Sequence, residues 1–203
     1  KMTKDYKIIV ATHKQFTMPA DTDLYLPIHV GSEGKEMLGY QCDNEGDNIS
    51  SLNPYYCELT GLYWAWKNLE CDYLGLVHYR RYFTAKRHSY SETIDMNDII
   101  LSKAELQDLL AESDVIVPKK RKYYIETLYS HYAHTHDANH LDVTRQIVSE
   151  LRPDYIDAFD QVMKQRSGYM FNMFIMSKEN VAAYCEWLFP IIDELYKRLD
   201  ITD

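Results

Sequence analysis

The chain has 203 residues, of which 46% are hydrophobic and 26% are charged, and its formal net charge is −9. This length and composition are typical of one sizeable soluble domain, and we expect a single domain over residues 1–203. The acidic balance argues against broad nucleic-acid binding, which needs a basic surface, but it leaves room for a local basic pocket that binds one small anion.

The first half of the chain alternates strand-like and helical segments. The run YKIIVAT, residues 6–12, is nearly all apolar, as expected of a strand covered on both faces. A second short strand, DLYLPIHVG, contains Pro27, which favours an edge position. Residues 31–53 are polar and rich in glycine, which predicts a long loop. Asn53 suits the cap and Pro54 the first residue of a helix that continues through YYCELTGLYWAWKNLE.

The second half predicts the same alternation. The strand YLGLVHYRRYF, residues 73–83, is followed by a short helix with the capping-box residues Ser102 and Glu105, and then by the short strand DVIVP. Residues 123–166 have helical patterns, GYMFNMFIMS is strand-like, and KENVAAYCEWLFPIIDELYKRL is a long amphipathic helix. Strands that alternate with helices predict an α/β fold, with a mainly parallel sheet flanked by helices.

Several familiar motifs are missing from the sequence. The four cysteines show no spacing typical of a metal site, and free thiols in a reducing cytosol are the simpler interpretation. There is no GxGxxG, P-loop or GxSxG motif, which removes the simplest dinucleotide, NTPase and hydrolase interpretations. No apolar run is long enough to span a bilayer, and the start KMTKDYKIIV lacks the apolar region of a signal peptide, so we expect a cytoplasmic protein.

Polar side chains follow the first predicted strand. In α/β folds, ligands bind beyond the carboxyl ends of the strands. Thr12, His13 and Lys14 come directly after the run at residues 6–12 and could donate hydrogen bonds to an anion or a base. A polar loop after a strand is equally common, so these residues alone leave both interpretations open.

A cationic cluster ends the strand that begins at residue 73. His78, Arg80 and Arg81 stand there, and two adjacent arginines cannot both lie in the core without partners. They either form ion pairs with part of the acidic excess or clamp a phosphate, whose oxygens a guanidinium binds in pairs. Because the position is a strand end, we favour the phosphate clamp.

The segment DNEGDNISSLNP is the richest polar stretch of the chain. Its alternating acids Asp43, Glu45 and Asp47 hint at a calcium loop, but Gly46 stands two places early for an EF-hand and no helix precedes it. The loop either caps the next helix or grips the hydroxyls of a ribose or sugar. The helix start at Asn53 also offers a positive dipole end to a phosphate.

Two further groups of polar residues are ambiguous. Asn172 lies in an apolar run and must find hydrogen bonds, either from a ligand hydroxyl or from the backbone, and the residues alone slightly favour the backbone. Four histidines have helical spacings that could pair zinc ligands on one face, but no HExxH motif occurs, and we favour surface or acid–base histidines over a metal site. They are His131, His134, His136 and His140.

The segments VATHK, PIHVG, DNEGDNISSLNPYYCELTGLYWAWKN and DYLGLVHYRRYF, in this order, resemble a family of small bacterial glycosyltransferase-like proteins, first catalogued as a domain of unknown function. Its members occur in capsular and exopolysaccharide biosynthesis, and some are linked to galactofuranosyl or galactosyl transfer. The resemblance runs from about residue 7 to the end of the chain and is densest from Asp43 to Phe83. Members usually continue with another helical segment, which implies that this chain is truncated at its C-terminus.

The resemblance implies a GT-A-like (Rossmann-like) fold that binds a nucleotide sugar. In most such enzymes the strand corresponding to YLGLV ends in an Asp-x-Asp that holds a divalent metal on the pyrophosphate. Here His78, Tyr79 and Arg80 take that place. We therefore expect no required metal cofactor, because Arg80, Arg81 and His78 would stabilise the charge on the leaving diphosphate instead. Mn²⁺ or Mg²⁺ bound elsewhere, for instance by the loop from Asp43 to Asp47, stays an open alternative.

The resemblance also implies roles for the candidate residues. Asn172 would contact the donor or acceptor sugar, and Glu58 either faces the site or tunes the helix start. The candidates for a catalytic base, which must be a carboxylate or a histidine near the acceptor hydroxyl, are Glu126, His131, His136 and Asp137. The donor-binding residues would be Thr12, His13, Lys14, Asp43, Asp47, Asn48, Ser50, His78, Arg80 and Arg81.

The leading hypothesis is a glycosyltransferase (a hexosyltransferase) that moves a sugar, galactosyl or galactofuranosyl among the candidates, from a UDP-linked donor to a growing capsular or exopolysaccharide acceptor. Its partners would be the nucleotide sugar and a lipid-linked or oligosaccharide acceptor, not nucleic acid. It would act in the cytoplasm at the inner face of the membrane, with at most peripheral association. The alternatives are a non-catalytic nucleotide-sugar or carbohydrate-binding module, which the 18 tyrosines and the missing Asp-x-Asp favour, and a metal-dependent hydrolase that uses the histidines.

Overall fold

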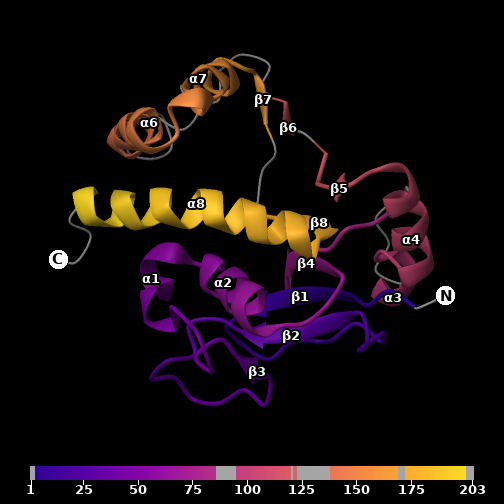
Figure 1. Cartoon of the computed structure of the whole chain (residues 1–203). Coiled ribbons are helices and arrows are strands. Elements are labelled where there is room, and N and C mark those ends of the chain that lie inside the picture. Colours follow the sequence, from indigo (N-terminus) through magenta and orange to yellow (C-terminus); the bar gives the residue numbers. More distant parts are fainter. Residues whose placement is uncertain (1–2, 86–94, 120, 123–137, 169–171, 200–203) are drawn as a thin grey trace. The chain divides into compact units, whose positions relative to one another are not determined.

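The structure is a computed structural model, and it describes residues 3–85, 95–119, 121–122, 138–168 and 172–199 (Figure 1). The chain divides into two compact units. Unit 1 contains Lys1–Pro118 and Asn172–Ala183, and unit 2 contains Lys119–Phe171 and Tyr184–Asp203. The single domain expected over residues 1–203 stays a prediction.

Unit 1 is built on a six-stranded sheet with the order β3-β2-β1-β4-β8-β5 (Figure 1). The strand β8 (Phe174–Ser177) runs antiparallel to its two neighbours, β4 and β5 (Val115–Ile116). The other strands pair in parallel, which confirms the predicted mainly parallel sheet. They are β1 (Tyr6–Thr12), β2 (Tyr25–His29), β3 (Gln41–Cys42) and β4 (Tyr73–His78).

Helices cover both faces of this sheet, as predicted. On one face, Gly61 lets α2 (Leu59–Asn68) approach the sheet closely. A Cβ atom at Gly61 would lie 2.7 Å from Val30 Cγ1. On the other face, Ile8 and Val10 share a buried cluster with Leu106 of α4 (Lys103–Glu112). Successive strand residues point to opposite faces, which is why β1 supplies both cores. A shorter helix, α3 (Met96–Ile99), precedes α4, and α4 begins with the capping box predicted at Ser102 and Glu105.

The predicted helix after residue 53 is broken in two, which corrects the sequence analysis. A 3₁₀ turn, η1 (Ser50–Leu52), leads into α1 (Asn53–Tyr56), and α2 starts only at Leu59. The break lies at Cys57, whose φ is 53°. The N-cap of α1 is Leu52 and not Asn53, and the Asn53 amide nitrogen donates to the Cys57 carbonyl at 2.8 Å.

Unit 2 is largely helical. Its two-stranded antiparallel sheet pairs β6 (Arg121–Lys122) with β7 (Ser167–Gly168). Its core contains Ile147, Val148 and Ile191, with Phe159 and Leu195 packed against them. The helices are α6 (Ala138–Leu151), the 3₁₀ turn η2 (Pro153–Tyr155), α7 (Ile156–Met163) and the part of α8 (Lys178–Leu199) that begins at Tyr184.

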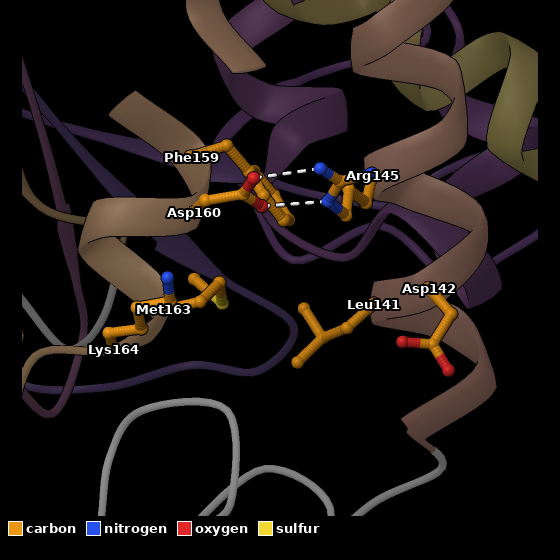
Figure 2. A pocket seen from close by; sticks show the side chains of 7 residues that line it. All are labelled: Leu141, Asp142, Arg145, Phe159, Asp160, Met163 and Lys164. Carbon is orange, nitrogen blue, oxygen red and sulfur yellow. Dashed lines mark hydrogen bonds and ion pairs between the residues drawn. The ribbon is translucent and has the colours of Figure 1, made fainter. Parts of the chain in front are cut away.

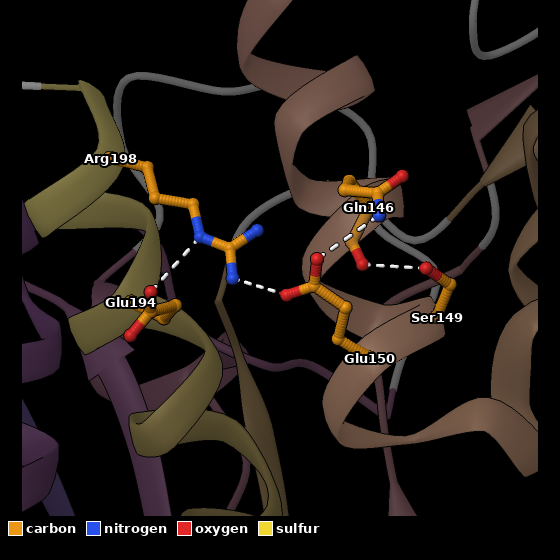
Figure 3. Close-up of polar contacts among 5 residues, drawn as sticks. All are labelled: Gln146, Ser149, Glu150, Glu194 and Arg198. Carbon is orange, nitrogen blue, oxygen red and sulfur yellow. Dashed lines mark hydrogen bonds and ion pairs between the residues drawn. The ribbon is translucent and has the colours of Figure 1, made fainter.

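Ion pairs join the helices of unit 2. Figure 3 shows Arg198 of α8 between Glu194, to which its Nε donates at 3.0 Å, and Glu150 of α6. Figure 2 shows a second pair, in which Arg145 donates to both oxygens of Asp160 at 2.7 Å beside a cavity between α6 and α7. None of the helices in the described part of the chain combines the length and apolarity needed to cross a membrane.

Gly75, in the middle of β4, offers a direct test of how tightly the sheet is packed. A Cβ atom there would lie 2.8 Å from Ile175 Cγ1, 3.1 Å from the Phe174 carbonyl oxygen and 3.2 Å from Ile8 Cγ1. We expect Gly75→Ala to lower the free energy of unfolding by about 1–3 kcal/mol, because the added methyl overpacks a buried strand. Urea denaturation followed by circular dichroism measures this loss, and an unchanged midpoint would show that β8 shifts to accept the methyl.

Candidate functional site

The carboxyl ends of the parallel strands meet at one edge of the unit 1 sheet. In the strand register, Thr12 lies opposite His29, and His29 lies opposite Cys42. His78, the last residue of β4, lies opposite Ala11. Since β8 runs the other way, Asn172, which lies two residues before it, stands at the same edge. The fold therefore brings together segments that are far apart in the sequence.

Cations and aromatic rings surround Tyr79, the residue after β4. Lys14 Nζ lies 5.5 Å and Arg80 Cζ lies 5.2 Å from the centroid of the Tyr79 ring. The rings of His13 and Phe16 contact the same residue at centroid distances of 5.4 and 5.8 Å. His13, Lys14 and Arg80 are exposed, and no carboxylate among the described residues pairs with Lys14 or Arg80. We call His13, Lys14, Tyr79 and Arg80 the cation cluster; it is a positive surface in an acidic protein.

A tight turn after β4 brings Arg81 back beside His78. The amide of Arg81 donates to the His78 carbonyl at 2.9 Å, and the His78 amide donates to the Arg81 carbonyl at 3.2 Å. Arg81 is exposed. The turn fixes the backbone on both sides of Tyr79 and Arg80, so the cation cluster stands on an ordered support.

Thr12 supports the cation cluster through hydrogen bonds to the backbone of Lys14. Its side chain is buried, donates to the Lys14 carbonyl at 2.6 Å and accepts from the Lys14 amide at 3.2 Å. The hydroxyl holds the turn that presents His13 and Lys14, and the ligand contact expected of Thr12 stays a prediction.

Asp43 is the centre of a buried hydrogen-bond network, which argues against its expected contact with a ribose or sugar. The carboxylate is fully buried, and its Oδ2 accepts from the Gly31 amide at 2.8 Å and the Thr60 hydroxyl at 2.7 Å. Its Oδ1 accepts from the Ser32 amide and hydroxyl at 3.1 and 2.9 Å, and from the Ser50 hydroxyl at 2.5 Å. Five protein donors leave no room for a ligand, so Asp43 and Ser50 join β2, the polar loop and α2.

The other predicted loop residues also bond within the protein. The Asn48 amide nitrogen donates to the carbonyls of Asn44 and Gly46 at 3.1 and 2.8 Å, and its oxygen accepts from the Ser50 amide. Asp47 is exposed and accepts from the Tyr63 hydroxyl of α2 at 2.9 Å. These contacts order the loop, and a ligand contact by Asp47 or Asn48 stays a prediction.

A polar triangle links β4, α2 and the start of β8. The Glu58 carboxylate lies 3.3 Å from His78 Nε2 and accepts from the Asn172 side chain at 3.3 Å. Burial raises the pKa of Glu58, but hydrogen bonds from His78, its own backbone and Asn172 outweigh this and hold the pKa below its ordinary value. Glu58 is therefore a charged, partly buried group at the same edge as the cation cluster.

The sequence did not predict His29 as a site residue. Its position at the end of the second predicted strand was the signal that could have indicated it. It is 3% exposed, and neither its buried Nδ1 nor the buried Tyr82 hydroxyl has a hydrogen-bond partner among the described residues. Burial lowers the pKa of His29. The charge of Asp43 opposes this change, and His13 adds to it. The neutral form of His29 is therefore favoured, and its buried Nδ1 is a polar atom of the strand-end edge that the described residues leave unsatisfied.

The described residues do not fit a divalent metal at the end of β4. His78 and Arg80 take the position expected of the Asp-x-Asp carboxylates, and the oxygens of Asp43 are already filled. Across residues 3–85, 95–119, 138–168 and 172–199, no three ligating side chains gather around a common point. The candidate bases Glu126, His131, His136 and Asp137, and His134, lie outside the described residues.

The comparison with known families agrees with this architecture. A family model described as "Domain of unknown function (DUF4422)" matches residues 7–203. The chain belongs to the DUF4422 family. No curated protein matches the DUF4422 chain.

Among solved structures, the DUF4422 chain is similar to the apo structure of WbbM, a bifunctional glycosyltransferase. The sequences are 34% identical and the TM-score is 0.84, over 95% of this chain and 37% of the WbbM chain. The DUF4422 chain thus spans little more than a third of the length of that structure. This similarity confirms the predicted glycosyltransferase-like α/β fold.

Proposed function

We propose that the DUF4422 chain transfers a hexosyl group, galactosyl or galactofuranosyl, from a UDP-linked donor to a growing capsular or exopolysaccharide. The acceptor would be lipid-linked or an oligosaccharide, and the reaction would take place in the cytoplasm at the inner face of the membrane. The observation that carries the proposal is the similarity of 95% of the chain to a glycosyltransferase at 34% identity.

The chemistry of the edge supports this proposal. Glycosyl transfer breaks the bond between the anomeric carbon and a diphosphate oxygen, and the leaving diphosphate keeps the electron pair. Preorganised positive groups stabilise the charge that grows there in the transition state. The cation cluster, with His78 and Arg81 beside it, is the group of described residues suited to that role. Arg80 can bind two phosphate oxygens with its planar guanidinium.

Binding of a nucleoside diphosphate tests the proposal most directly. We expect UDP or a UDP-sugar at 100 times its Kd to raise the Tm by about 5–10 °C, since this concentration adds about 2.7 kcal/mol of stability. Uridine, which lacks the diphosphate, is the matched control and should give little shift. Thermal shift across a panel of nucleotide sugars, with and without EDTA, measures ligand class and metal need together. No shift with any member of the panel would overturn the proposal, and binding without turnover would favour a non-catalytic module.

A further inference from the structure

The carboxylate of Glu58 has no part in the chemistry proposed so far, yet the fold holds it firmly. Its Oε1 lies 3.3 Å from His78 Nε2 and accepts a hydrogen bond from Asn172 Nδ2, also at 3.3 Å. The side chains of Glu58 and His78 are only 18% and 29% exposed. The three residues come from the start of α2, the end of β4 and the approach to β8, so tertiary structure alone brings them together.

The backbone before Glu58 is strained in a way that places this carboxylate. Cys57 has φ 53° and ψ −136°, a combination that glycine adopts readily and other residues rarely do. Such strain persists only where neighbouring contacts over-determine it, and it clusters at functional sites. Here the Asn53 amide nitrogen donates to the Cys57 carbonyl and to the Thr60 hydroxyl across the break. The break therefore has a local support, and its result is that Glu58 faces His78.

His78 has two ring nitrogens with different surroundings. Nε2 faces the Glu58 carboxylate. An ionised carboxylate accepts hydrogen bonds and donates none. Nδ1 makes no hydrogen bond with a described residue. A carboxylate on one nitrogen fixes which nitrogen carries the proton and how the ring is oriented, as it does in other histidine sites.

We propose that Glu58 is a positioning residue for His78: it accepts a hydrogen bond from Nε2–H, fixes the ring, and leaves Nδ1 to face the leaving diphosphate. When the diphosphate binds, Nδ1 takes up one proton from solvent, and both nitrogens then donate, Nε2–H to Glu58 and Nδ1–H to a phosphate oxygen. In the transfer step itself no proton moves from His78 to the diphosphate; the bond that breaks joins the anomeric carbon to the diphosphate oxygen, and its electron pair stays with the diphosphate. The role of Nδ1 rests on the proposed function, whereas the Nε2 contact exists in the free protein.

The first test uses the free full-length chain, labelled with ¹⁵N-histidine. Long-range ¹H–¹⁵N spectra should show the His78 proton on Nε2 in the wild type. In Glu58→Gln, whose amide can donate as well as accept, they should show a mixture of both tautomers. The exposed Glu112→Gln at the end of α4 is the matched control and should leave the His78 signals unchanged. A proton on Nδ1 in the wild type, or identical His78 signals in Glu58→Gln, would overturn the proposal.

The second test measures turnover of a nucleotide sugar. We expect Glu58→Gln to lower kcat about 10–100-fold, as loss of an orienting partner does, with a much smaller change in the donor KM. Glu58→Asp, which keeps the charge, should recover part of kcat. Equal kcat in wild type and Glu58→Gln would also overturn the proposal. If the wild type shows no turnover, the proposed function fails, and the spectra still decide whether Glu58 positions His78.

Discussion

Asp43→Ala is expected to destabilise unit 1 by about 3–5 kcal/mol, a large share of the 5–15 kcal/mol typical of a folded domain. The substitution would leave five donors, from Gly31, Ser32, Ser50 and Thr60, facing a buried space without an acceptor. Each such donor loses its bond without regaining water. Denaturant unfolding, followed by tryptophan fluorescence and circular dichroism, measures the loss.

Asp47→Ala in the same loop is the matched control. Asp47 is exposed, and its carboxylate accepts one hydrogen bond, from Tyr63. We expect it to cost less than about 1 kcal/mol, as surface substitutions usually do. If Asp43→Ala and Asp47→Ala unfold at the same denaturant concentration, the buried network does not organise the loop, and a ligand contact by Asp43 would have to be considered again.

Arg80→Ala is expected to lower the rate of glycosyl transfer about 100–1000-fold, the usual cost of removing one preorganised group from a developing oxyanion. Arg80 is exposed, lies against Tyr79 and pairs with no carboxylate among the described residues, so its loss should affect the ligand and not the fold. Steady-state kinetics with a nucleotide sugar measure the loss of rate, and the Kd of UDP measures the loss of binding. Arg80→Lys should recover only part of the rate, because an ammonium does not bind two oxygens at once.

Lys67→Ala is the control for charge and for cation–ring contact. Lys67 lies 3.9 Å from the centroid of the Trp66 ring, but it stands at the far end of α2 from the strand ends. The rate should stay within about twofold of wild type, since removing a distant exposed charge changes little. A comparable loss of rate in Arg80→Ala and Lys67→Ala would show that net charge, and not the cation cluster, governs the reaction.

The parts of the fold that the sequence predicted are those governed by local rules. The limits of β1, the capping box at Ser102 and the long helix α8 follow from apolar runs, cap chemistry and helical spacing, all of which act over a few residues. The break at Cys57 could not be predicted in this way, because YYCELTGLYWAWKN has helical spacing throughout. The break depends on hydrogen bonds from Asn53 and on the contact between Glu58 and residues 20 or more positions away.

The candidate site was predicted in part for the same reason. Because strand ends converge in α/β folds, the sequence alone placed Lys14 and Arg80 at one edge, and the structure brings both against Tyr79. Burial, by contrast, is a property of the whole fold. Asp43 looked like one acid of an exposed polar loop, and its four partner residues lie 7 to 17 positions away in the sequence. Nothing local distinguishes it from the exposed Asp47.

The route of the chain through the sheet has a consequence for how this family can diversify. The chain leaves unit 1 after Pro118 and returns at Asn172. Both points lie at the strand-end edge, because β5 and β4 are each antiparallel to β8. The pairings of β8 fix the sheet whatever the intervening segment contains. A swap or a change in length of that segment, by recombination or in the laboratory, would therefore leave the cation cluster and its supporting strands in register.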